Sequence, residues 1–275
     1  MIIPLLIFYL AFLYKAMYGA IIAFMDYRPA KGILGSDWVG VEQFVRFFHS
    51  PYFYRLIRNT IVLSIYSLLF CFTAPILLAL LLNEVKGKRF KSITQTVSYL
   101  PHFISMVVAV GMIKEFCMTD GLINDIIVFF GGERSALLQN PALYRTIYII
   151  SDIWQEVGWG SIIYLAALAG IDSERYEAAA IDGAGKFRQM IHVTIMLILR
   201  IGSLMNMGYE KTILLYNSST YETADIISSY IYRVGLLEQN WSYSTAIGLF
   251  NSVINCILLL AANRISKKVT ETSLW

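Results

Sequence analysis

Charged residues are scarce in this sequence. Only 15% of its 275 residues are Asp, Glu, Lys or Arg, whereas 57% are hydrophobic and the mean hydropathy is +0.60. A soluble domain carries roughly 25% charged residues. This composition excludes an ordinary soluble domain and indicates a membrane protein, whose length is better counted in spans of about 20 residues.

The sequence also lacks the residues that build disulfide, metal or nucleic-acid sites. Its three cysteines are odd in number and far apart, and its three histidines are scattered. Neither set predicts a disulfide framework or a metal centre, and the cysteines are interpreted as small buried hydrophobic residues. The net charge of +3 provides no basic surface for nucleic acid.

Long apolar runs are what the chain does contain. They are Ile2–Met25, Thr60–Leu82, Ile93–Ile113, Ile147–Leu168, Ile191–Met207 and Tyr243–Ala262. The first run lacks the basic start and the small-residue cleavage site of a signal peptide, so it is interpreted as a span. Backbone polar groups in lipid must be satisfied within their own segment, so these runs predict helices. The predicted fold class is an all-α integral membrane protein with six transmembrane helices in a single domain, residues 1–275.

Lysine and arginine are distributed unevenly between the connections. One alternating set holds ten of them in 40 residues: Glu84–Lys91, Ile171–Met190 and Arg264–Trp275. The other set holds nine in 96 residues: Asp26–Arg58, Cys117–Arg145 and Gly208–Trp241. Cytoplasmic connections carry the excess of basic residues, so the denser set and both termini are expected in the cytoplasm.

One cytoplasmic connection contains YEAAAIDGAGKF, Tyr176–Phe187, which raises the question of nucleotide binding. A phosphate-binding loop needs G-x-x-x-x-G-K-[ST] after a strand. If Gly185 and Lys186 end that motif, its first glycine falls on Ala180 and its hydroxyl residue falls on Phe187. Both positions are wrong and no strand pattern precedes them, so the segment is not predicted to bind a nucleotide itself.

The same connection favours a short amphipathic helix followed by a turn. Glu174, Glu177 and the following alanines favour a helix with its acids toward the N-terminal end. Gly183 then breaks or turns it. A short alanine-rich helix of this kind suits the groove of a partner protein. Composition alone allows a plain connector at the membrane interface equally well.

This connection resembles the EAA motif of ATP-binding cassette importer permeases. The matching residues are Glu177, Ala178, Ala179, Asp182, Gly183 and Ala184. Three further stretches, DIWQEVGWGSIIYLAALAGID, YLPHFISMVVAVGMI and ETADIISSYIYRVGL, resemble the carbohydrate-uptake permeases that import oligosaccharides or polysaccharide fragments. The resemblance covers nearly the whole chain.

The resemblance implies a type I importer permease in the bacterial cell membrane. Residues 171–190 are then the cytoplasmic coupling loop, which inserts into a groove on an ATPase so that ATP hydrolysis drives translocation. The implied partners are a second permease subunit in a pseudo-symmetric heterodimer, two copies of the ATPase, an extracellular solute-binding protein, the carbohydrate and membrane lipid. No cofactor is expected in this chain, because ATP and magnesium belong to the ATPase, and no bond chemistry is expected of it.

The sequence departs from the family pattern after the EAA motif. About ten residues beyond the motif glycine the family continues with I-x-L-P, whereas here Val193, Thr194 and Ile195 are followed by Met196 without a proline. The fifth apolar run is also short, at about 25 Å of helix against about 30 Å of hydrocarbon. Either this helix is short and lines a cavity, or residues are missing from it; the absent proline and the short run together resemble a deletion of roughly two to three helical turns.

Charged and aromatic residues within the spans suggest a substrate pathway, because intramembrane charges usually face the bundle interior or water. The candidates are Asp152, Trp154, Glu156, Trp159, Tyr164 and Arg200. Asp152, Glu156 and Trp159 share one helix face at spacings of four and three. The alternatives are pairing of the charges between helices and, for the aromatic rings, a place at the membrane interface. Arg200 suits either an acidic sugar or a salt bridge to one of the two acids.

Two other functions remain as alternatives. One is an importer permease for a different solute, such as amino acids or phosphate esters, against which the carbohydrate-type flanking sequence argues. The other is a membrane-embedded enzyme that uses Asp152 and Glu156 as a carboxylate pair, as glycosidases do. Two acids four residues apart on one helix in lipid lack an evident water-filled cleft, which argues against that chemistry.

Overall fold

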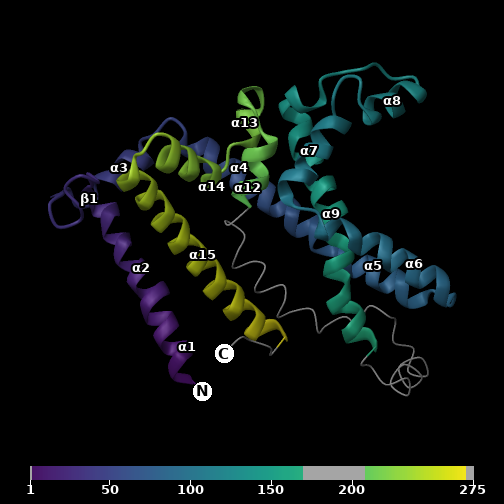
Figure 1. The fold of residues 1–275 in the computed structure, drawn as a ribbon, viewed down its shortest axis with the longest axis horizontal. Helices are drawn as coiled ribbons and strands as arrows, with labels where there is room; N and C mark the ends of the chain where they lie inside the picture. Colours follow the sequence, from purple (N-terminus) through teal and green to yellow (C-terminus); the bar gives the residue numbers. More distant parts are fainter. Residues whose placement is uncertain (1, 170–207, 271–275) are drawn as a thin grey trace.

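The computed structural model describes residues 2–169 and 208–270, and these are mostly helical (Figure 1). The chain begins with one continuous helical run in α, π and 3-10 geometry: α1 (Ile2–Phe8), η1 (Tyr9–Tyr14), α2 (Lys15–Met17) and η2 (Tyr18–Phe24). A small antiparallel hairpin follows, in which β1 (Met25–Asp26) pairs with β2 (Asp37–Trp38). The predicted first span is therefore helical to within one residue of its end.

The middle of the described chain contains two groups of helices, each interrupted by turns. The first consists of α3 (Glu42–Phe48), α4 (Phe53–Tyr66), η3 (Ser67–Cys71) and α5 (Thr73–Glu84). The second consists of α6 (Lys88–Tyr99), η4 (Leu100–Phe103), α7 (Met106–Phe116), α8 (Leu122–Phe129), η5 (Leu137–Gln139) and the 29-residue α9 (Pro141–Ala169). After residue 207 come α12 (Tyr209–Leu215), η7 (Ser218–Thr220), α13 (Tyr221–Ala224), α14 (Ile227–Tyr232), η8 (Arg233–Leu237) and α15 (Trp241–Thr270).

Two helices in the described part are long and apolar enough to cross a membrane. They are Phe53–Glu84 and Trp241–Ile265, which contain the second and sixth predicted spans. The fourth predicted span lies within α9, whose hydropathy is lowered by polar residues such as Asp152, Gln155 and Glu156. The fifth predicted span falls outside the described residues.

The third predicted span differs from the expected single helix. The helical pair Lys88–Phe103 and Met106–Phe116 is bent by 103°, so it counts as a third span only if both arms are taken together. Pro101 lacks the N–H group that would continue the helix. The Ser105 hydroxyl then accepts a hydrogen bond from the Val108 amide at 3.4 Å and caps a new helix.

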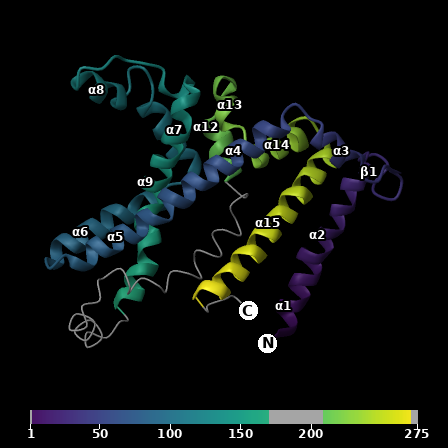
Figure 2. The same cartoon turned by 180° about the vertical axis from the view of Figure 1, so that it is seen from behind.

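The ends of the long helices lie on two opposite sides of the molecule. In both views the start of α1 and the ends of α9 and α15 point to one side, whereas the hairpin, α8 and α13 lie toward the other (Figures 1 and 2).

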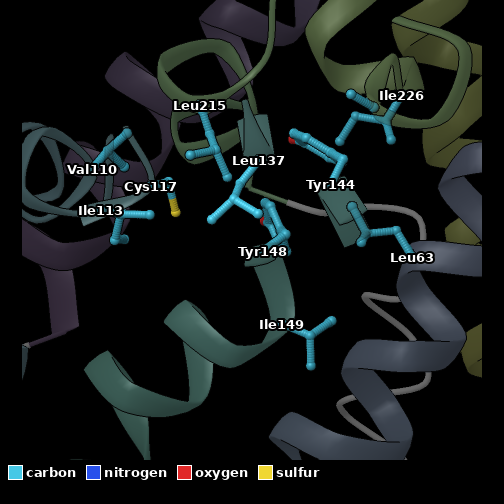
Figure 3. Close-up of a cluster of buried hydrophobic side chains, with 11 residues drawn as sticks. Leu63, Val110, Ile113, Cys117, Leu137, Tyr144, Tyr148, Ile149, Leu215 and Ile226 are labelled. Atoms are coloured by element: carbon cyan, nitrogen blue, oxygen red, sulfur yellow. The ribbon is translucent and has the colours of Figure 1, made fainter. Parts of the chain in front are cut away.

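Buried side chains form two apolar clusters. The larger joins α4, α7, α9 and α12 around Tyr144 and Tyr148 (Figure 3). The smaller gathers Phe47, Ile227 and Ile247 between α3, α14 and α15. Of the three free cysteines, one is buried, one is half-buried and one, on α15, is exposed, so the expectation of burial holds fully only for Cys117.

Helix α9 also makes a close backbone contact with the end of α6. A Cβ atom added at Gly158 would overlap the Ser98 carbonyl oxygen. Only glycine allows this approach without moving the backbone. The contact fixes α9 against α6 at the level of its polar residues.

Candidate functional site

The candidate site is a stripe of polar residues along α9. Asp152, Glu156 and Trp159 lie on one uninterrupted helix at spacings of four and three, which places them on one face. Each contacts a side chain from a different part of the chain. The stripe therefore connects α9 to two other helical segments.

Asp152 pairs with Lys211 of α12. The Lys211 ammonium lies 3.0 Å from Asp152 Oδ1 and donates to the Tyr148 carbonyl oxygen at 3.2 Å. It also lies over the Tyr148 ring, 4.7 Å from the centroid. The Lys211 side chain is only 2% exposed and the Asp152 side chain 22%. Burial lowers the pKa of Lys211, and the Asp152 carboxylate acts against that shift.

Glu156 contacts the segment between α6 and α7. His102 Nδ1 lies 3.0 Å from Glu156 Oε2, and because an ionised carboxylate only accepts, the ring nitrogen is the donor. The His102 ring stacks on Trp159 with 4.5 Å between centroids and 2° between planes. The Glu156 and Trp159 side chains remain partly exposed, at 46% and 45%. This part of the stripe presents a carboxylate and an aromatic ring to the surroundings.

Trp154 lies on a different face of α9. It lines an apolar cavity of about 400 Å³ between α7 and α9, together with Met112, Phe116, Ile147 and Ile150. The structure therefore separates Trp154 from the polar stripe. Trp154 is still partly exposed at 38%.

The remaining predicted residues do not join the stripe. Tyr164 is half-buried, five residues beyond Trp159 and so turned away from it on the helix. Arg200 and the predicted coupling residues lie outside the described residues: Glu177, Ala178, Ala179, Asp182, Gly183 and Ala184. Their roles stay predictions.

Two residues of the site were not predicted from the sequence. Lys211 and His102 supply the partners of Asp152 and Glu156, from positions 59 and 54 residues away in the chain. A signal for Lys211 was present, because it is a single cation beside the apolar TILL stretch of α12. His102 follows Pro101 at the helix break and had no comparable signal.

The pairing of the two acids argues against a catalytic carboxylate pair. Both stripe carboxylates are engaged by a basic side chain, and within residues 2–169 and 208–270 no group of three or more His, Cys, Asp or Glu could hold a metal ion. Long apolar helices that contact one another through a stripe of polar residues indicate an integral membrane protein.

Comparison with known proteins identifies the family. The chain belongs to the binding-protein-dependent transport system inner membrane component family, whose model matches residues 71–271. It is a permease subunit of an ATP-binding cassette importer and not an enzyme. This excludes the membrane-embedded carboxylate enzyme.

The most informative relatives are carbohydrate permeases. The chain is 46% identical to the polygalacturonan/rhamnogalacturonan transport system permease protein YteP of Bacillus subtilis, covering 100% of this chain and 89% of the relative. It is 26% identical to the arabinooligosaccharides transport system permease protein AraP of the same organism, covering 96% and 84%.

A solved structure shares the fold. A chain of a bacterial transporter that imports the acidic polysaccharide alginate has a TM-score of 0.88 and 41% identity, covering 98% of this chain and 94% of that one. A second structure of a bacterial alginate transporter, in complex with a periplasmic protein bound to an alginate pentasaccharide, has a TM-score of 0.89 and 40% identity, covering 100% and 95%. The type I importer permease architecture expected from the resemblance is thus confirmed as a fold.

Proposed function

We propose that this chain is one half of a permease pair that carries acidic oligosaccharides, fragments of uronate polysaccharides, into a bacterial cell. The observation that carries the proposal is its similarity, at 46% and 41% identity over nearly the whole chain, to permeases whose names specify polygalacturonan and alginate. Both polymers consist of sugars that carry a carboxylate. A neutral or non-sugar solute has no comparable support.

The compensation of Asp152 by Lys211 is compatible with an anionic substrate. An unpaired acid in a pathway of low polarity repels a passing carboxylate strongly, because Coulomb energies rise as the dielectric constant falls. Lys211 compensates Asp152, and His102 donates to Glu156. The stripe can therefore line a path for an acidic sugar without a net negative charge at Asp152.

The proposed topology has six membrane helices in a multi-pass cell-membrane protein with both termini in the cytoplasm. The uneven distribution of Lys and Arg supports it. The arrangement of the helix ends agrees, because the start of α1 and the ends of α9 and α15 point to the same side (Figures 1 and 2).

The proposed energy source is a pair of ATPase subunits beneath residues 171–190. The EAA-like residues of that connection support docking to such a partner. ATP and magnesium would bind to the ATPases, and a second permease subunit would complete the pathway. The alginate structure with its periplasmic protein supports an extracellular solute-binding protein as the delivering partner.

Affinity purification of the tagged chain from membranes tests this assembly. Mass spectrometry of the purified complex is expected to identify an ATPase and a second permease of similar size. A stable chain that purifies alone under several mild detergents would contradict the proposed assembly.

A further inference from the structure

A cluster of arginines lies beside the beginning of α9. Its anchor is Asp225, whose side chain is fully buried between α13 and α14. Arg233 binds both carboxylate oxygens at 2.7 and 3.2 Å, and Arg55 of α4 lies 3.1 Å from one of them. The Ser229 hydroxyl donates to the same carboxylate at 3.1 Å. Asp225 is thus fully engaged by these partners.

Asn59 connects this anchor to α9. Its buried amide nitrogen donates to the carbonyl oxygens of Glu222 at 2.9 Å and Asp225 at 3.1 Å. Because both amide hydrogens are used in this way, the orientation of the side chain is determined. Its oxygen accepts a hydrogen bond from Arg145 Nη2 at 2.9 Å.

Arg145 and Arg58 are not compensated by an acid in the described part of the chain. The half-buried Arg145 guanidinium donates to the neutral Asn59 amide, and its Nε atom is buried without a hydrogen-bond partner. Arg58 is exposed on α4, directly before Asn59. Burial, and then the charge of Arg58, lower the pKa of Arg145. An arriving anion would relieve both effects.

Arg145 also belongs to the same face of α9 as the polar stripe. It precedes Asp152 by seven residues and Trp159 by fourteen. At 3.6 residues per turn these spacings are close to two and four full turns, so the three residues lie on nearly the same side of the helix. Arg145 lies about 10 Å along the helix from Asp152. Arg145 lies near the start of α9, and it is the other end of α9 that points to the same side as the start of α1 and the end of α15 (Figures 1 and 2).

We propose that Arg58 and Arg145 form a binding site for a sugar carboxylate at the outer end of the α9 stripe. The two guanidinium groups provide the charge, since Arg forms strong bidentate bonds with carboxylates. Asn59 and the Asp225 anchor hold Arg145 in place. The inference rests on the proposed function, because it names the residues that select an acidic substrate.

Uptake by the complete importer, reconstituted in liposomes with saturating binding protein, tests the site. Two probes are compared: trigalacturonate and its methyl ester, which keeps the sugar rings but removes the negative charges. Arg58→Gln and Arg145→Gln are each expected to lower the uptake rate of trigalacturonate about tenfold, the effect of one lost charge-assisted bond. The uptake rate of the ester is expected to change less than about twofold. Arg145→Lys is expected to retain part of the preference for trigalacturonate over the ester, because it keeps the positive charge.

The matched control is Arg134→Gln, since Arg134 is an outer-side arginine that is already paired with Asp125; its rates are expected to equal those of the wild type. Arg58 is exposed, so its variant tests the site even if Arg145→Gln fails to assemble, which basal ATPase activity reports. If the wild type prefers trigalacturonate and both glutamine variants keep that preference, the site is wrong and the proposed function stands. A wild type that takes up both probes equally contradicts the proposed substrate class and the site with it.

Discussion

Lys211 is the most deeply buried charged residue of the candidate site. Its ammonium group is almost fully buried and is held by Asp152, a backbone carbonyl and the Tyr148 ring. A buried ion pair contributes little net stability, but removing one partner leaves an uncompensated charge at high cost. The pair therefore fixes how α12 sits on α9.

Asp152→Asn is expected to destabilise the permease by about 3–5 kcal/mol, because it leaves the Lys211 ammonium buried without a counter-charge. Asp152→Leu combined with Lys211→Met is expected to restore most of that loss, since neither charge remains. Thermal unfolding of the purified complex measures both.

The matched control is Asp125→Asn, which breaks an exposed pair with Arg134 and is expected to cost at most about 1 kcal/mol. Equal losses of stability in the Asp125 and Asp152 variants would contradict the burial of the Lys211 ion pair.

At this scale the sequence identifies the acids but not their partners. The spacing of Asp152, Glu156 and Trp159 correctly places them on one helix face. The partners Lys211 and His102 come from segments more than 50 residues away, and local periodicity contains no information about such pairs. For Asp152 the structure shows pairing between helices, with Lys211 of α12.

Among the helices, α9 is constrained most closely at Gly158. The backbone of α6 lies so near that any side chain at this position meets the Ser98 carbonyl. The helices can accept a Cβ atom only by moving apart, which also displaces the neighbouring polar stripe.

Gly158→Ala is expected to destabilise the protein by about 1–3 kcal/mol through this overlap. Gly111→Ala in α7 is the matched control, since a Cβ atom added at Gly111 would meet nothing within 4 Å; there alanine is expected to stabilise the helix by about 0.5–1 kcal/mol. Thermal unfolding measures the difference. If both variants shift the midpoint in the same direction, the close contact between α6 and α9 is wrong.

The existence of the helices is easier to predict than their continuity. Apolar runs correctly indicate α4–α5, α9 and α15. The break within Ile93–Ile113 depends on Pro101 and on the Ser105 cap, which are signals shorter than the hydropathy window that defines a span. The large exposed apolar surface of α1 and α4–α5 also shows why hydropathy marks these helices clearly.

The predicted shortening after Ile195 lies outside the described residues. The alignment with YteP spans 285 positions, whereas this chain has 275 residues. By subtraction, 285 − 275, at least ten positions hold a residue in the relative alone. The shortening inferred from the missing proline and the short fifth run stays a prediction.

For the whole molecule, the separation of helix ends onto two sides matters most. It places the start of α1 and the ends of α9 and α15 away from the hairpin and α13 (Figure 1). A transporter needs this polarity, because energy is supplied on one side and the substrate arrives from the other.

Glu177→Lys and Gly183→Asp are expected to leave the chain inserted and assembled but to uncouple ATP hydrolysis from uptake, because both alter the proposed docking surface. The readout is the ratio of sugar imported to ATP hydrolysed in liposomes. Lys86→Glu, an exposed change in another basic connection, serves as the control and should keep the wild-type ratio. Normal ratios in both test variants would show that this connection does not couple.

ATP-driven uptake of an acidic oligosaccharide by the reconstituted importer is the decisive measurement for the proposed function. Trigalacturonate is expected to accumulate inside liposomes only when ATP is hydrolysed, and to do so faster than its methyl ester. Accumulation that is independent of ATP, or equal rates for the charged and esterified sugars, would contradict the proposal.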